Sequence, residues 1–277
     1  MMTTLTTAAE LEHGRAAGIG YLRRRGRGTT LVLLHGIGSN AASFSALVAA
    51  LAPTMEVIAW DAPGYADSVP LAIAEPTPRD YAAALVRLLD ALDLSCISLA
   101  GHSLGTLFAA SFAANYPDRV GALALISPSL GHGVRPGAVL PPSVQSRIDD
   151  IVDLGPAEFA KRRAPRLVGD PTERPDVVAA VEAAMASVKL DGYIQAVHAL
   201  GAGRLLDDAR RIAAPSIVAV GSRDQITPPG NAREAYAALA NPAGFHEILG
   251  AGHALPQEQP SALAPLLMSL VARVAHG

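Results

Sequence analysis

The sequence predicts an α/β protein with a mostly parallel, doubly wound sheet and a helical lid. Short apolar segments of strand length alternate with helical stretches through most of the 277 residues. The segment 30–34 carries a continuous apolar run, which is typical of a strand that helices cover on both faces. The alternation stops only between about 130 and 211, where Pro and Gly separate several helical stretches. We therefore expect a core of residues 1–129 and 212–277 and a helical cap of residues 130–211.

The first half of the chain is expected to supply five strands and three helices. One helix has clear start signals: Thr77 suits the N-cap, Pro78 the first helical position, and Asp80 comes three residues after the cap, as in a capping box. The single cysteine, Cys96, is expected to be a small buried hydrophobic residue at the start of an apolar strand. The expected strands are 18–23, 30–34, 56–60, 96–101 and 120–126, and the expected helices are 41–52, 77–92 and 104–115.

The second half is expected to begin with the cap and then to resume the alternation. The cap helices are expected at 142–153, 156–168, 175–188 and 190–200. The core is expected to continue with strands at 216–220 and 245–249 and helices at 230–240 and 259–275.

Composition and charge indicate a soluble globular protein and not a disordered or nucleic-acid-binding one. Half of the residues are hydrophobic, 17% are charged and the net charge is −3, so a nucleic acid partner is not expected. The dense basic run 23–27 is interpreted as a solvated turn between two strands. No segment has 18 uninterrupted apolar residues, and residues 1–10 lack the basic and apolar regions of a signal peptide. We expect a cytoplasmic protein without membrane association; the oligomeric state does not follow from the sequence.

A serine flanked by glycines lies where an apolar strand meets a helix. Gly101-His102-Ser103-Leu104-Gly105 fits the pattern G-x-S-x-G, in which the serine occupies a strained turn and projects its hydroxyl. The glycines are expected because a close approach of strand and helix leaves no room for a Cβ atom. The N-terminus of the following helix would direct its unpaired N–H groups toward an oxyanion formed at the serine. The segment is therefore a candidate for nucleophilic catalysis.

An acid and a histidine follow two later strands, as a serine nucleophile requires. Asp224 follows the strand 216–220, and His253 follows the strand 245–249. A serine hydroxyl needs a base to accept its proton, and the base needs an acid to orient it. The order Ser103, Asp224, His253 and the position of each residue after a strand agree with the arrangement expected for such a fold. We therefore predict Ser103 as nucleophile, His253 as base and Asp224 as the orienting acid.

With these residues the chain resembles the α/β-hydrolase superfamily over nearly its whole length, about 17–275. His35-Gly36 is similar to the HG turn of that superfamily, and 61–68 is similar to its D-x-x-G-x-G-x-S loop, with Ala66 in place of the second glycine. The resemblance implies that the backbone N–H groups of Ile37 and Leu104 form the oxyanion hole. It also implies the corresponding fold and hydrolysis through an acyl-enzyme, without a cofactor.

Other titratable residues have simpler interpretations. His35 and His102 belong to turn motifs, where we expect them to orient loops, and Asp61 and Asp67 are interpreted as turn-forming residues. Two histidines of the predicted cap are candidates for a contact with the substrate, although a position on the surface is favoured for both. The other histidines lie in a strand or near the termini, and none of them is expected to be catalytic. These are His132 and His198 in the cap, and His13, His246 and His276 elsewhere. The spacing of His, Asp and Glu does not match a metal site, and no phosphate-binding glycine motif follows the first strand.

The leading functional hypothesis is a carboxylesterase for small or medium esters. A C–C bond hydrolase of the meta-cleavage type and an enol-lactonase remain alternatives, because the same three residues serve those reactions. Two features argue against a C–C hydrolase. The turn 35–39 lacks the proline that is common in that family, and Ala254 stands where an aromatic residue is common after the histidine. A cofactor-free perhydrolase and a non-catalytic binding protein are less favoured, the latter because Ser103, Asp224 and His253 are all present.

Overall fold

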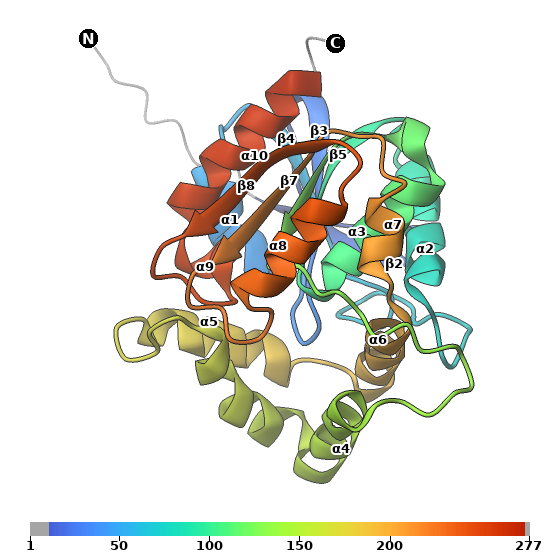
Figure 1. Ribbon diagram of the computed structural model, residues 1–277, viewed down its shortest axis with the longest axis vertical. Helices are drawn as coiled ribbons and strands as arrows, with labels where there is room; N and C mark the ends of the chain where they lie inside the picture. The colour runs from blue at the N-terminus through green and yellow to red at the C-terminus, as the bar shows by residue number, and fades with distance from the viewer. Residues whose placement is uncertain (1–10, 275–277) are drawn as a thin grey trace.

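One eight-stranded sheet with helices on both faces forms the body of the protein (Figure 1). The structure is a computed structural model that describes residues 11–274. The strand order is β1-β2-β4-β3-β5-β6-β7-β8, with β1 and β2 antiparallel to their neighbours and all other neighbours parallel. This confirms the predicted fold class. The N-terminal residues 1–10 and His276, for which predictions were made, lie outside the described residues.

All strands predicted from the sequence are present. They are β2 (Ile19–Arg24), β3 (Arg27–Leu34), β4 (Met55–Trp60), β5 (Ile97–His102), β6 (Val120–Ile126), β7 (Ser216–Gly221) and β8 (Pro242–Ile248). One further strand, β1 (Glu12–Ala16), was not predicted because its sequence EHGRA has no apolar run. It pairs with β2 at the edge of the sheet, where it buries little apolar surface.

The helices that flank the sheet agree with most of the predicted ranges. They are α1 (Ser45–Ala50), α2 (Pro78–Ala91), α3 (Leu104–Asn115), α7 (Leu205–Ala209), α8 (Pro229–Ala238), α9 (Leu255–Glu258) and α10 (Pro260–Val274). A 3₁₀ turn, Ala41–Phe44, precedes α1, so the helix predicted at 41–52 is shorter and less regular than expected. The predicted capping box is confirmed, because Oδ2 of Asp80 accepts a hydrogen bond from the Thr77 N–H at 2.7 Å.

Alternating residues of β3 show how the sheet forms two apolar layers. Leu34 packs in a cluster with residues of α2 and α3, including Phe108. Leu33 packs in a second cluster with residues of α1 and α10, including Leu267. Because successive side chains of a strand point to opposite faces, a continuous apolar run is what a strand covered on both sides requires.

Two predictions on single residues were wrong. Cys96 is exposed, because β5 begins one residue later, at Ile97. Arg24 is buried, although the basic run was expected to be a solvated turn. It is the last residue of β2, and strand alternation turns it inward, where its guanidinium donates to the carbonyl groups of Val48 at 2.5 Å and Ala52 at 2.8 Å. Arg24 thus adds hydrogen bonds at and just beyond the C-terminal end of α1, where backbone carbonyls are short of N–H partners.

Three helices between β6 and β7 lie across the carboxyl ends of the strands, and we call them the cap helices (Figure 1). They are α4 (Pro142–Arg163), α5 (Pro175–Ala186) and α6 (Leu190–Ala202), and α4 packs against both others. The helix predicted at 142–153 is the first half of α4, which bends at Gly155, where φ is 71°; the helix predicted at 156–168 is its second half, which ends at Arg163, and a 3₁₀ turn over Ala164–Leu167. The short α7, which was not predicted, packs on α3 and α8 beside the sheet. None of the helices between residues 11 and 274 combines the length and apolar character that a membrane crossing requires.

Candidate active site

Ser103 occupies a strained turn between β5 and α3. Its φ of 54° and ψ of −118° lie outside the regions that L-residues favour. The Ser103 N–H donates to the carbonyl of Ile126 at 2.9 Å, and the Thr106 N–H donates to the Ser103 carbonyl at 3.0 Å. These bonds tie the turn to β6 on one side and to the first turn of α3 on the other. The backbone is therefore held in a conformation that it would not adopt alone.

Glycines permit the close packing around this turn, as predicted. A Cβ atom on Gly101 would lie 2.3 Å from the carbonyl oxygen of Gly105, and one on Gly105 would lie 2.2 Å from the carbonyl oxygen of Leu34. A Cβ atom on Gly36 would lie 2.8 Å from Cβ of Ser103. These separations are too short for real Cβ contacts. The loop that carries Ile37 is therefore packed directly against the serine.

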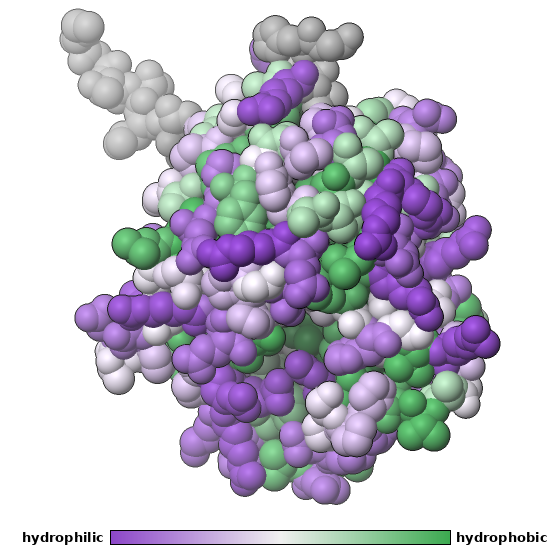
Figure 2. All heavy atoms as spheres, in the orientation of Figure 1, coloured by the Kyte–Doolittle hydropathy of each residue, from purple (hydrophilic) through white to green (hydrophobic). Residues whose placement is uncertain are grey.

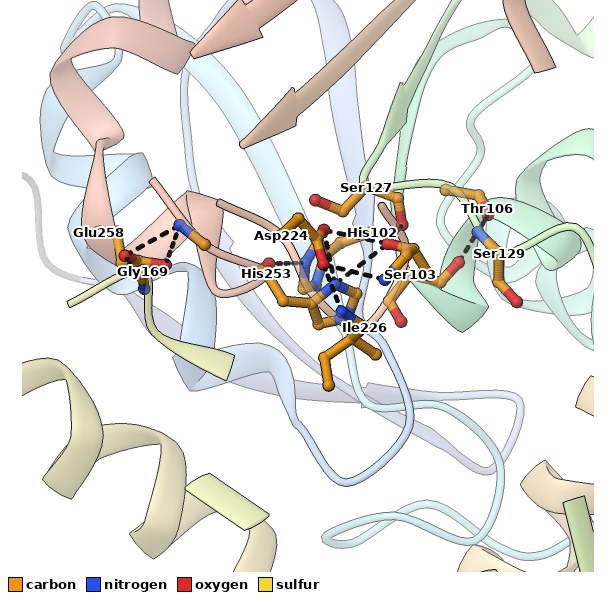
Figure 3. Close-up of polar contacts among 12 residues, drawn as sticks. His102, Ser103, Thr106, Ser127, Ser129, Gly169, Asp224, Ile226, His253 and Glu258 are labelled. Atoms are coloured by element: carbon orange, nitrogen blue, oxygen red, sulfur yellow. Dashed lines mark hydrogen bonds and ion pairs between the residues drawn. The ribbon is translucent and has the colours of Figure 1, made fainter. Parts of the chain in front are cut away.

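Asp224 and His253 form a buried hydrogen-bonded pair next to Ser103 (Figure 3). Asp224 follows β7, His253 lies between β8 and α9, and their side chains meet with His253 Nδ1 2.9 Å from Asp224 Oδ2. Oδ1 of Asp224 accepts hydrogen bonds from the backbone N–H groups of Ile226 and Thr227, both at 2.9 Å. Burial alone would raise the pKa of Asp224, but the attraction and hydrogen bond of His253, with a smaller contribution from Thr227, lower it to about 2. The carboxylate is therefore charged at neutral pH.

Thr227 is a member of this network that the sequence reasoning missed. Its Oγ1 lies 3.0 Å from Asp224 Oδ2, 3.1 Å from His253 Nδ1 and 3.0 Å from the carbonyl oxygen of Ser127. The hydroxyl thus joins the acid, the histidine and the end of β6. Its position three residues after Asp224 is the signal that would have identified it, since a threonine there closes a turn back onto the carboxylate.

Groups on both sides hold the loop of His253. His102 Nε2 lies 2.8 Å from the His253 carbonyl oxygen, and the carboxylate of Glu258 accepts from the Gly252 N–H at 3.0 Å. The other oxygen of Glu258 accepts from the N–H of Gly169, which follows α4, at 2.8 Å. Burial lowers the pKa of His102 to about 3, so its ring is neutral and donates this hydrogen bond. His102 therefore orients a loop, as expected.

The other turn residues also keep the roles predicted for them. His35 Nε2 accepts from the Ala62 N–H at 3.0 Å, and Asp61 accepts from the Ala41 N–H at 2.8 Å, so both join neighbouring loops. Ala66 adopts a φ of 42°, so the loop keeps a left-handed residue at the position where glycine is common in the superfamily motif.

Ser103 and His253 line a cavity of about 360 Å³ between the strand ends and the cap helices. Figure 2 shows a hollow between these two parts of the molecule, with hydrophobic residues inside it and hydrophilic residues around it. The volume is in the range of small-molecule sites. Apolar side chains line much of the wall: Ile37, Leu104, Leu130, Leu167, Met185 and Leu200. Polar side chains from the cap also reach it: His132, Ser143, Arg147, Arg163 and Tyr193.

The structure thus brings together all five residues that the sequence singled out for the site. Ser103, His253, Ile37 and Leu104 line the cavity, and Asp224 lies behind His253. Of the two cap histidines, His132 lines the cavity, whereas His198 lies away from it. The sequence did not indicate Arg147 or Arg163, because arginines on a helix are ordinarily solvated.

The sequence is similar to a family model and to characterised proteins over most of its length. A model of the alpha/beta hydrolase family matches residues 31–266. A poly(3-hydroxyalkanoate) depolymerase from Ectopseudomonas oleovorans is 29% identical over 251 residues, covering 88% of this chain and 84% of that protein. The dihydrolipoyllysine-residue acetyltransferase component of the acetoin cleaving system from Cupriavidus necator is 27% identical over 270 residues, covering 89% of this chain. The chain spans 64% of that protein's length.

Solved structures show the same fold over nearly the whole chain. A thermophilic esterase from Thermogutta terrifontis superposes with a TM-score of 0.82 at 24% identity, covering 96% of this chain and 99% of that one. The enol-lactonase from Burkholderia xenovorans superposes with a TM-score of 0.83 at 22% identity, covering 94% and 100%. With the family match over residues 31–266, the fold and the residues gathered at the strand ends lead to one conclusion: this chain is a member of the alpha/beta hydrolase family.

Proposed function

We propose that this hydrolase cleaves carboxylic esters through an acyl-enzyme formed on Ser103. The observation that carries the proposal is the pairing of His253 Nδ1 with Asp224 at 2.9 Å, which leaves Nε2 of His253 for Ser103, a residue that lines the same cavity. Asp224 fixes the ring tautomer and stabilises the imidazolium that forms. The strained turn that presents Ser103 adds support, because such strain is common at nucleophiles.

The proposed reaction has two steps. Oγ of Ser103 attacks the ester carbonyl carbon while its proton passes to Nε2 of His253, and the tetrahedral intermediate collapses as His253 returns that proton to the departing alkoxide. Water then enters, gives a proton to His253 and attacks the acyl-enzyme carbonyl. The collapse of this second intermediate returns the proton to Ser103 Oγ and releases the carboxylic acid.

Backbone N–H groups of Ile37 and Leu104 are the proposed oxyanion donors. Leu104 is the first residue of α3, so its N–H has no partner within the helix, and Ile37 belongs to the loop packed against Ser103. Both residues line the cavity. Each donor would stabilise the transition state by about 3 kcal/mol, to judge from the loss of one such donor elsewhere.

The comparisons support a hydrolytic reaction. Among the possible hydrolytic reactions, we propose the cleavage of esters. The depolymerase that is 29% identical to this chain acts on poly(3-hydroxyalkanoate), and one structural relative is an esterase. The same three residues would also open an enol lactone or cleave a C–C bond next to a ketone. A panel of p-nitrophenyl esters, lactones and dienoate ketones separates these reactions, and we expect the highest kcat/KM on esters.

Replacement of the nucleophile tests the proposal. We expect Ser103→Ala to lower kcat on a p-nitrophenyl ester by at least about 10⁴-fold. Its melting temperature should stay close to that of the wild type, since the methyl group fits the space of the CH₂OH group. A fluorophosphonate should label the wild type at Ser103 and leave the variant unlabelled. Full activity of Ser103→Ala would refute the assignment, and an unlabelled wild type would favour a binding protein.

A further inference from the structure

Two arginine side chains from α4 line the cavity that contains Ser103. Arg147 precedes the bend at Gly155, and Arg163 follows it. In a straight helix, 16 residues would separate them by about 24 Å along the axis. The bend turns the second half of α4 back, so that both side chains lie against one cavity of about 360 Å³ (Figure 1).

Neither of these arginines forms an ion pair with an acidic side chain in the described part of the chain, residues 11–274. Arg162, next in sequence, pairs with Glu158 at 2.8 Å. Within residues 11–274, by contrast, no carboxylate oxygen lies within 4.0 Å of a guanidinium nitrogen of Arg147 or Arg163. Burial lowers the pKa of Arg163 and the charge of Arg147 lowers it further, whereas Tyr193 and, more weakly, Asp150 raise it. Two like charges therefore lie close together in a partly buried place, which costs free energy unless an anion joins them.

Aromatic side chains hold Arg163 in place. Its guanidinium carbon lies 5.2 Å from the ring centre of Phe159, and that ring meets Tyr193 edge-on, with centres 5.5 Å apart. Both rings are almost fully buried. A guanidinium that packing already orients loses little freedom when it binds a ligand, and its planar fork matches the two oxygens of a carboxylate.

From this arrangement we infer that the cavity binds a substrate that carries a carboxylate in addition to the carbonyl group attacked by Ser103. A half-ester of a dicarboxylic acid is the simplest such substrate. Its anion would lie between Arg147 and Arg163, and its methylene groups would contact apolar side chains such as Met185 and Leu200. The inference rests on the proposed function, which places the carbonyl group of the substrate at Ser103. It adds that the substrate carries a negative charge.

Two esters of similar length test the inference. p-Nitrophenyl hydrogen glutarate carries the carboxylate, and p-nitrophenyl valerate does not. We expect the wild type to prefer the glutarate ester, and Arg163→Gln or Arg147→Gln to lower kcat/KM on it by about 10- to 100-fold, as expected for the loss of one charged hydrogen bond. The same variants should stay within about threefold on valerate. Arg166→Gln is the matched control, because Arg166 is exposed and does not line the cavity.

Calorimetry with glutarate supplies a measurement that needs no turnover. We expect saturable binding to the wild type and to Arg166→Gln, and much weaker binding to Arg163→Gln. Three results would overturn the inference. They are an equal kcat/KM of the wild type on the two esters, an equal loss of kcat/KM on both esters in the arginine variants, and an absence of glutarate binding to the wild type. If neither ester is turned over and the fluorophosphonate leaves Ser103 unlabelled, the proposed function is refuted. Glutarate binding then still shows whether the two arginines bind a carboxylate.

Discussion

The strand-end loops and the cap helices contribute to the same cavity in different ways. The loops fix their groups through short-range constraints: a φ of 54° at Ser103, glycines without room for a Cβ atom, and a carboxylate that accepts two backbone N–H groups. The cap helices supply Arg147 and Arg163 from the long helix α4. These two side chains line one cavity only because α4 bends at Gly155. Under the proposed function, the loops would carry out the reaction and the cap helices would select the substrate.

Asp224→Asn should give the largest effect and tests this division directly. The amide cannot hold the His253 tautomer or stabilise its cation, so we expect kcat to fall by about 10⁴-fold on any ester. In the cap, Tyr193→Phe should change kcat by less than about tenfold. Steady-state kinetics on p-nitrophenyl valerate measures kcat of both variants. Asp67→Asn is the control, because it replaces an aspartate in an exposed loop. Similar losses in Asp224→Asn and Tyr193→Phe would remove the distinction between the regions.

The same contrast explains how much the sequence predicted. Ser103, Asp224 and His253 were found because each follows an apolar strand, and parallel strands bring their carboxyl ends to one edge of the sheet. The inward turn of Arg24 and the cavity position of Arg163 were not predicted. Both depend on where a long polar side chain points after packing, which neither charge nor periodicity specifies.

His102→Gln should change how the free energy of unfolding depends on pH. Burial lowers the pKa of His102 to about 3 in the folded protein, whereas in the unfolded chain it is near 6.5. The unfolded state therefore binds one more proton between these values, and stability falls by about 1 kcal/mol per pH unit as the pH drops below 6.5. Glutamine retains a donor for the His253 carbonyl but does not titrate.

Urea unfolding between pH 6.5 and 4.5 measures this slope. We expect a shallower slope in His102→Gln, with a residual slope from His35, His132 and His246, whose pKa values are also lowered by burial. Parallel curves for wild type and His102→Gln would show that His102 is not held neutral.

Gly155→Ala tests the bend of α4 without a steric clash. A Cβ atom there meets no other atom within 4 Å, so the cost arises from a backbone conformation with φ of 71° and ψ of 160° that alanine rarely adopts. We expect a loss of about 1–3 kcal/mol in the free energy of unfolding. Because the bend brings Arg147 and Arg163 together, KM for the glutarate ester should rise while kcat on the valerate ester changes little.

Gly137→Ala is the matched control for the bend. Gly137 also has a positive φ, 80°, and open space around it, but it lies in the loop before α4 and outside the cavity. We expect a stability loss of the same sign and no change in the ratio of kcat/KM between the two esters. An equal change of that ratio in both variants would attribute the effect to reduced stability and not to the position of the arginines.

Thr227→Val should have a much smaller effect than Asp224→Asn, and it separates the groups that react from a group that supports them. Valine preserves the shape but removes the hydroxyl that lies 3.0 Å from Asp224 and 3.1 Å from His253. The two backbone N–H groups and the Nδ1 hydrogen bond remain on Asp224, so we expect kcat to fall only about tenfold, with KM unchanged. Thr227→Ser restores the hydroxyl and should recover kcat to within about threefold of the wild type. A loss as large as that of Asp224→Asn would mean that the threonine, and not the backbone turn, holds the carboxylate in place.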